Sequence, residues 1–193
     1  MPARLKHKEP IVDAAIRHFR RQGYPETRLN EIAESSGAPK GSIYYHFPNG
    51  KRSIAVAAVD EAGRRMAGTM RDIASRSASP AEFIKGFAEK LACWMVATSF
   101  GNACPMTSVL LELAPEDRDA RMAGARAYER RFEVIQEVLE AAGYPDSVSR
   151  SIAVVWMSAL NGALIQCRVY RSPSPLYTVG KFLGDTLEPV DRN

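Results

Sequence analysis

The stretch KGSIYYHF, at positions 40–47, gathers hydrogen-bonding side chains into two turns of an expected helix. Its lysine, serine, tyrosines and histidine supply an ammonium, hydroxyls and an imidazole, which can reach phosphate oxygens or base edges of nucleic acid. Gly41 lets the backbone come close to such a partner. Ile43 and Phe47, four residues apart, would form the inward apolar face of the helix. The pattern predicts a helix that packs on one side and binds a polar surface on the other.

The distribution of charge also indicates an anionic partner. The chain has a net charge of +4, from 26 Lys/Arg and 22 Asp/Glu. Residues 1–52 hold ten Lys/Arg and five Asp/Glu, whereas the remaining residues hold sixteen and seventeen. All of the excess positive charge therefore lies in the first quarter of the chain, as expected of a nucleic-acid-binding segment. Charge alone would equally fit a solvated basic tail.

The amino-acid composition restricts the classes of protein to which this chain can belong. With 46% hydrophobic and 25% charged residues, the 193-residue chain is typical of a soluble globular protein. The longest mainly apolar run, 151–167, is shorter than the roughly 20 residues that span a bilayer. The N-terminus lacks the apolar run of a signal peptide. Three cysteines (Cys93, Cys104, Cys167) without a CxxC pair, and no Asp/Glu/His cluster at ligand spacing, indicate a reduced cytoplasmic protein without metal or cofactor.

Every periodic segment of the sequence is helical, so we expect an all-α fold of about nine helices. Gly23, Gly101 and Gly143 are expected helix stops, and Ser79-Pro80-Ala81-Glu82 is a capping box with proline at the first helical position. The expected helices are 11–23, 27–37, 38–47, 51–75, 79–101, 107–113, 115–143, 152–170 after a cap at Asp146, and 174–187. We expect an N-terminal three-helix domain over 1–52, joined through helix 51–75 to a helical domain over 53–193.

Three short helices with a tight turn between the second and third match a helix-turn-helix (HTH). Gly37 lies where the chain must reverse sharply, and glycine tolerates the positive φ that such a turn can require. In this motif the third helix enters the DNA major groove and the second lies across the backbone. That placement explains the polar aromatics at positions 40–47.

The stretch TRLNEIAESSGAPKGSIYYHFPNGKRSI resembles the signature of TetR-type transcriptional repressors. The resemblance covers about residues 9–60, with a Pro48-Asn49-Gly50 stretch slightly longer than the commonest family form. NACPMTSVLLELAP also resembles the drug- or flavonoid-responsive, LmrA/YxaF-like branch. The resemblance implies phosphate contacts from Thr27, Tyr45, His46 and Lys51. It places Asn30, Lys40, Ser42 and Tyr44 nearest the base edges, with Gly41 close to the duplex; packing alone is the alternative for Tyr45 and His46.

The resemblance also implies that the remaining helices form a homodimer and an enclosed ligand pocket. The last two helices are apolar on more than one face, which favours burial on all sides. A four-helix interface with two helices from each subunit explains this pattern, and Gly162, Ala163 and Gly180 would allow close approach. A monomer with a large internal core is the alternative.

For the pocket we expect a mainly apolar lining with a few placed polar groups. Asn161 and Gln166 are amides within an apolar helix and need partners, which a ligand, a neighbouring helix or a second subunit could supply. Each aromatic could also be plain core. The sequence predicts a small, hydrophobic and aromatic effector. The candidate lining is Trp94, Phe100, Met106, Leu110, Tyr128, Phe132, Trp156, Leu160 and Asn161.

The leading hypothesis is a ligand-responsive dimeric repressor that binds a palindromic double-stranded DNA operator. An enzyme is disfavoured because all three histidines fall in the first 46 residues, while the cysteines begin at position 93. A helical protein-interaction module and a transcriptional activator without a small-molecule ligand are the alternatives.

Overall fold

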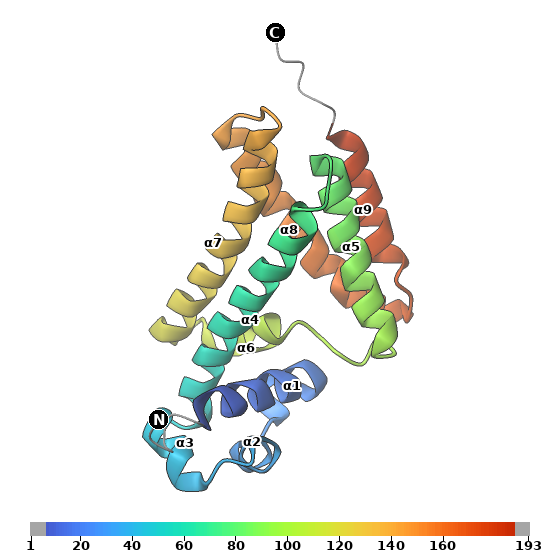
Figure 1. Cartoon of the computed structure of the whole chain (residues 1–193). Helices are drawn as coiled ribbons and strands as arrows, with labels where there is room; N and C mark the ends of the chain where they lie inside the picture. Colours follow the sequence, from blue (N-terminus) through green and yellow to red (C-terminus); the bar gives the residue numbers. More distant parts are fainter. Residues whose placement is uncertain (1–6, 188–193) are drawn as a thin grey trace. The chain divides into compact units, whose positions relative to one another are not determined.

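The computed structural model describes residues 7–187, which form nine α-helices and no strand (Figure 1). The all-α expectation is therefore confirmed for the described residues. The helices are α1 (Lys8–Glu26), α2 (Leu29–Ser36), α3 (Lys40–His46), α4 (Lys51–Ala74), α5 (Pro80–Ala97), α6 (Pro105–Leu113), α7 (Arg118–Ala141), α8 (Asp146–Tyr170) and α9 (Ser174–Thr186).

The helices pack into two compact units. Among the described residues, unit 1 comprises 7–64 together with 103–128, and unit 2 comprises 65–102 together with 129–187. This packing differs from the expected division at 52/53, because α6 and the first part of α7 pack with the N-terminal helices. Sequence periodicity identified these two helices but not the unit that they join.

Unit 1 is built on one apolar core. Ile43 of α3 and Phe47, which directly follows this helix, are buried in it, as their four-residue spacing predicts. Gly63 allows α4 and α7 to pack closely, since a Cβ there would lie 2.3 Å from the Cβ of Ala127. The core also includes Ile11, Ile16 and Phe19 from α1, Ile32 from α2, Ile54 and Val59 from α4, and Met106 and Val109 from α6.

Tight turns fix the positions of α2 and α3. Gly37 has the left-handed conformation, with φ 65°, that the sequence predicts between these helices. Gly23 breaks α1 with φ 83°, near the expected end of that helix. Helix α2 starts after Arg28, whose N–H donates to the Glu31 carboxylate at 2.6 Å. This hydrogen bond holds the pKa of Glu31 below its ordinary value.

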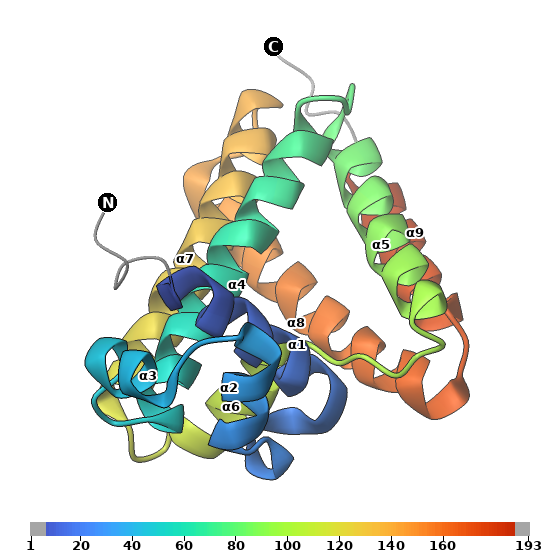
Figure 2. The same ribbon diagram turned by 60° about the horizontal axis from the view of Figure 1, so that its bottom comes forward.

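Unit 2 packs α9 against both α5 and α8, and Figures 1 and 2 show α5 and α9 side by side. Trp156 of α8 is fully buried between two phenylalanines of α5, with ring centroids 5.3 Å from Phe83 and 5.6 Å from Phe87. A Cβ on Gly180 would lie 2.6 Å from the Cβ of Ala88. The close approach expected at Gly180 is therefore made to α5 of the same chain.

Helix α8 is longer than the apolar run in the sequence suggested. It runs 25 residues from Asp146, and by length and composition alone it could cross a membrane. The expectation that no segment is long enough was thus wrong for this helix. Its face with Ala153, Trp156, Leu160 and Cys167 is buried within the chain, as in the core helix of a globular domain.

Candidate nucleic-acid interface

Helix α3 has one buried and one exposed face. Ile43 is anchored in the core of unit 1, while Tyr44 and Tyr45 are 56% and 61% exposed. Both tyrosines therefore lie on the outer face of this seven-residue helix, where a partner surface can reach them. The other predicted contact residues on α2 and α3 also reach solvent: Asn30, Lys40 and Gly41 are exposed, and Ser42 and His46 are half-buried.

Two neighbouring aromatic rings of α3 are in contact with each other. The Tyr45 and His46 rings meet edge to face, with centroids 5.0 Å apart. Pro39 precedes the helix, and its carbonyl accepts from the Ser42 N–H at 2.9 Å. The structure thus presents hydroxyl, imidazole and ammonium groups on one short helix, as the sequence predicts for a DNA-reading element.

Thr27 differs from the expectation. Its side chain is fully buried, and its hydroxyl donates to the Gly23 carbonyl at 2.6 Å. This residue ends α1, and the hydroxyl stabilises the break at Gly23. The Thr27 hydroxyl thus has an internal role, and the phosphate contact that the resemblance implies for this residue stays a prediction.

Lys51 also differs from the expectation. Its Nζ donates to the carbonyls of Tyr24 at 3.0 Å and Thr27 at 2.9 Å, and a third contact reaches Pro25 at 3.4 Å. The ammonium lies 4.3 Å from the centroid of the Tyr24 ring. Burial lowers the pKa of Lys51 below its ordinary value. This lysine ties the start of α4 to the end of α1, and the phosphate contact that the resemblance implies for it stays a prediction.

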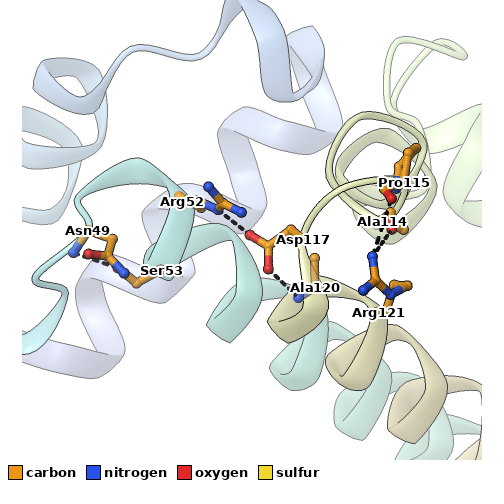
Figure 3. Close-up of polar contacts among 8 residues, drawn as sticks. All are labelled: Asn49, Arg52, Ser53, Ala114, Pro115, Asp117, Ala120 and Arg121. Atoms are coloured by element: carbon orange, nitrogen blue, oxygen red, sulfur yellow. Dashed lines mark hydrogen bonds and ion pairs between the residues drawn. The ribbon is translucent and has the colours of Figure 1, made fainter.

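Sequence reasoning missed the next residue, Arg52. Its Nε donates to the carboxylate of Asp117, which is buried at the start of α7 (Figure 3). Asp117 also accepts from the Ala120 N–H at 3.0 Å and so caps α7. The hydrogen bond from Arg52 lowers the pKa of Asp117. The acidic Pro-Glu-Asp start of this helix was visible in the sequence, but its partner was not.

A groove between α6 and α7 brings together two of the predicted lining residues, Leu110 and Tyr128. Its volume is about 310 Å³, at the lower end of small-molecule sites. Arg121 lies at its edge and donates to the Ala114 carbonyl at 2.9 Å, as Figure 3 shows. Met106 is buried in the unit 1 core and is not part of the lining. The other lining residues are Thr107, Leu111, Ala114, Gly124 and Ala125.

The remaining predicted lining residues belong to unit 2. The Trp156 indole is fully buried, yet its Nε1 has no hydrogen-bond partner among the described residues. Lys90 lies 5.5 Å from the centroid of the half-buried Trp94, and Arg150 lies 4.5 Å from that of Phe132. Leu160 is buried, while Phe100 and Asn161 are half-buried. The indole N–H is one of the buried polar atoms of unit 2 that have no hydrogen-bond partner among the described residues, and the Ser149 hydroxyl is another.

An apolar stripe runs along the exposed side of α8. Val148, Val155, Gly162 and Val169 follow one another at intervals of seven residues, and the three valines are 42%, 56% and 71% exposed. Nothing lies within 4 Å of a Cβ placed on Gly162. Between them stand Ser151, Ser158 and Ile165, all exposed. A seven-residue apolar repeat with small residues is the pattern by which helices pack against partner helices.

The comparisons with known proteins agree with this geometry. Residues 11–58 match the family "Bacterial regulatory proteins, tetR family", and residues 80–182 match "Transcriptional regulator LmrA/YxaF-like, C-terminal domain". The chain is 32% identical to the HTH-type transcriptional regulator LmrA of Bacillus subtilis over 94% of its own length and 96% of that protein. It is 28% identical to the regulator YxaF of the same organism, with coverages of 94% and 95%.

A solved structure of similar sequence supports the same assignment. The TetR transcriptional regulator from Legionella pneumophila superimposes with a TM-score of 0.79 at 25% identity, covering 94% of this chain and 97% of that one. The exposed recognition helix, the two family matches and the full-length relatives agree. The chain belongs to the TetR family of bacterial HTH transcriptional regulators, a family without enzymatic activity, and carries an LmrA/YxaF-like C-terminal domain.

Proposed function

We propose that this regulator is a cytoplasmic, homodimeric repressor that binds a palindromic operator and is released by a small hydrophobic effector. The observation that carries the proposal is the exposed polar face of α3, which projects Lys40, Tyr44 and Tyr45 from a helix anchored by buried Ile43 and Phe47. Lysine suits guanine O6 and N7, and the tyrosine hydroxyls suit phosphate or base edges.

The apolar stripe on α8 supports the dimer. Exposed Val155, Ile165 and Val169 would be covered by the same stripe of a second copy, and Gly162 would let the two backbones approach. A two-fold axis between the subunits presents the same recognition helix twice, so the operator would have two related half-sites. Exposed Tyr177 and Phe182 on α9 extend the apolar surface available to the partner.

The effector site is proposed within unit 2, and the unpaired Nε1–H of Trp156 is its hydrogen-bond donor. A flat hydrophobic molecule with an acceptor oxygen would satisfy this donor, whereas the buried rings of Phe83 and Phe87 leave it unmet. The predicted contact with the Asn161 amide would then be secondary. The effector must bind the non-DNA-binding conformation more tightly, with a coupling of about 1–3 kcal/mol.

The test of the proposed function is binding to DNA flanking the gene itself. Fragments of the adjacent intergenic region are titrated with protein, and the bound fragment is footprinted. A protected palindrome whose occupancy falls when a hydrophobic aromatic compound is added supports the proposal. A protected DNA segment that contains no palindrome would contradict the proposed binding of the protein as a homodimer. A protein that binds a partner protein but no duplex would instead be an interaction module.

Reporter assays separate repression from activation. Deleting the gene should raise transcription from the promoter that carries the protected palindrome. A fall in transcription after deletion would identify an activator.

A further inference from the structure

The two basic residues at the start of α4 have opposite environments. An ammonium has three N–H donors. Lys51 directs its donors at the three carbonyls of residues 24, 25 and 27, and its charge also lies against the Tyr24 ring. No donor is then left for a phosphate unless these contacts break. Breaking them would release the end of α1 and the turn into α2.

Arg52 has N–H donors that its ion pair with Asp117 does not use. Its side chain is 55% exposed, and its Nε pairs with Asp117. Asp117 is itself fixed, because it is buried and also accepts from the backbone of α7 (Figure 3). A guanidinium has five N–H donors, so fixing the Nε leaves the two Nη groups for another acceptor. The carboxylate thus holds the side chain in place without using up its hydrogen-bonding capacity.

The start of α4 is adjacent to the recognition helix. Gly50, with φ 57°, closes the turn that precedes Lys51. A Cβ at Gly50 would lie 4.0 Å from Tyr44 Cε1 and 3.6 Å from Leu29 Cδ2. The turn therefore lies beside both the exposed Tyr44 of α3 and Leu29, the first residue of α2. The first turn of the 24-residue α4 also carries the positive end of its helix dipole, which favours an anion nearby.

We propose that Arg52, and not Lys51, neutralises a DNA backbone phosphate beside the recognition helix. This inference rests on the proposed DNA-binding function and names a residue of that interface. Arg52 would keep its Nε on Asp117 and donate from both Nη groups to the phosphate oxygens. Arginine is suited to such bidentate phosphate contacts, whereas lysine acts as a point charge. Lys51 remains a structural tie within unit 1.

The experiment is the salt dependence of binding, measured by fluorescence anisotropy with the full-length protein on two labelled duplexes. One carries the footprinted operator and the other a scrambled sequence of equal length. Each phosphate contact contributes about 0.9 to the slope of log affinity against log salt concentration. Arg52→Gln should lower the slope by about 0.9 per subunit and weaken binding to both duplexes. Arg52→Lys should retain most of the slope.

Two variants serve as matched comparisons. Arg64 lies on the same helix and also pairs with a carboxylate, that of Glu61, so Arg64→Gln should leave the slope unchanged. Lys51→Met should leave the slope unchanged while lowering the unfolding temperature. Circular dichroism at the assay temperature verifies that each variant is folded.

The outcomes are decisive. An Arg52→Gln slope equal to that of the wild type overturns the inference, and so does a lowered slope in folded Lys51→Met. A wild type that binds neither duplex contradicts the proposed function itself and with it this inference. Wild-type binding with an unchanged Arg52→Gln slope contradicts only the inference.

Discussion

The recognition helix of unit 1 and the proposed effector region of unit 2 differ in whether their predicted residues are exposed or buried. On α3 the exposed and buried residues alternate as the sequence predicts, with Ile43 inside and Tyr44 and Tyr45 outside. In unit 2 the predicted lining residue Trp156 is instead the centre of a packed aromatic group with Phe83 and Phe87. The predicted residues of α3 are displayed on the surface of unit 1, whereas Trp156 is part of the core of unit 2.

The difference follows from what each task requires. Reading DNA needs polar groups displayed on a rigid helix, and an anchored short helix does this before any ligand arrives. An effector that alters a conformational equilibrium must distinguish two arrangements of packed side chains. A buried but unpaired donor such as Trp156 Nε1 is then more informative than the exposure of any one aromatic. The variants below probe each region, in order of decreasing expected effect.

The largest effect is expected from placing a charge on the apolar stripe of α8. Val155→Arg should abolish dimerisation and lower operator affinity by more than about 100-fold, because leaving an unpaired charge in an interface costs about 3–5 kcal/mol. The monomer should fold, since Val155 is 56% exposed within the chain. Sedimentation velocity gives the oligomeric state. Met122→Arg is the control. Met122 is an exposed residue of α7 in unit 1, so this variant should stay dimeric. A dimeric Val155→Arg protein would place the interface elsewhere.

A smaller effect is expected from disturbing the core of unit 1 alone. Gly63→Ala places a Cβ 2.9 Å from the Ala127 Cα, and overpacking of this kind costs about 1–3 kcal/mol of unfolding free energy. Gly68→Ala, on the same helix with open space around it, should gain up to about 1 kcal/mol.

Spectroscopy can locate that destabilisation. Both tryptophans, Trp94 and Trp156, belong to unit 2. In urea titrations, Gly63→Ala should therefore shift the circular dichroism transition more than the tryptophan fluorescence transition. Equal shifts of the two signals would show that the units unfold as one cooperative body.

The sequence predicted most of the helices because local signals mark their ends. Ser79 accepts from the Glu82 N–H as the cap of α5, and Gly37 adopts the positive φ expected of its turn. The end of α5 was misplaced, since the helix stops at Ala97 and not at Gly101. There Ser99 and Phe100 adopt left-handed φ values of 49° and 60°, which few non-glycine residues take and which periodicity does not reveal.

The exposure of the α3 residues could be predicted from their types. The contacts of Lys51 and Arg52 could not, because they depend on partners that are distant in the sequence. Lys51 and Arg52 are adjacent and both basic, so only their partners distinguish them. The carbonyls that hold Lys51 come from about 25 residues earlier, and Asp117 lies 65 residues after Arg52. No local pattern encodes such long-range pairings. A family motif records the residue type at a position and not its contacts in a particular chain, so the resemblance could not predict these internal contacts of Lys51.

A moderate effect on induction is expected in unit 2. Trp156→Phe keeps an aromatic ring but removes the unpaired Nε1–H. If the effector accepts from this donor, effector potency should fall about 3- to 10-fold, since one hydrogen bond contributes about 1 kcal/mol. Operator affinity without effector should be unchanged in an anisotropy assay. Phe132→Leu, which leaves the indole in place, serves as the comparison. An unchanged effector response in Trp156→Phe would show that the indole N–H is not used.

The smallest effect is expected at the charged clamp between α5 and α9. Asp185 accepts from Lys85 at 2.6 Å and from Lys181, and these hydrogen bonds lower its pKa to about 2. A carboxyl whose pKa is depressed on folding stabilises the protein above its ordinary pKa, near 4, and loses that stabilisation as the pH falls toward 2.

Asp185→Asn should therefore lower the unfolding temperature at pH 7 by no more than about 2 °C, because exposed ion pairs contribute little. The difference from the wild type should stay constant between pH 7 and about pH 5, and shrink below pH 4. Differential scanning fluorimetry between pH 7 and pH 3 measures the unfolding temperatures of the two proteins. A difference that grows as the pH falls has the wrong sign, and would show that the lysines do not stabilise the ionised carboxylate.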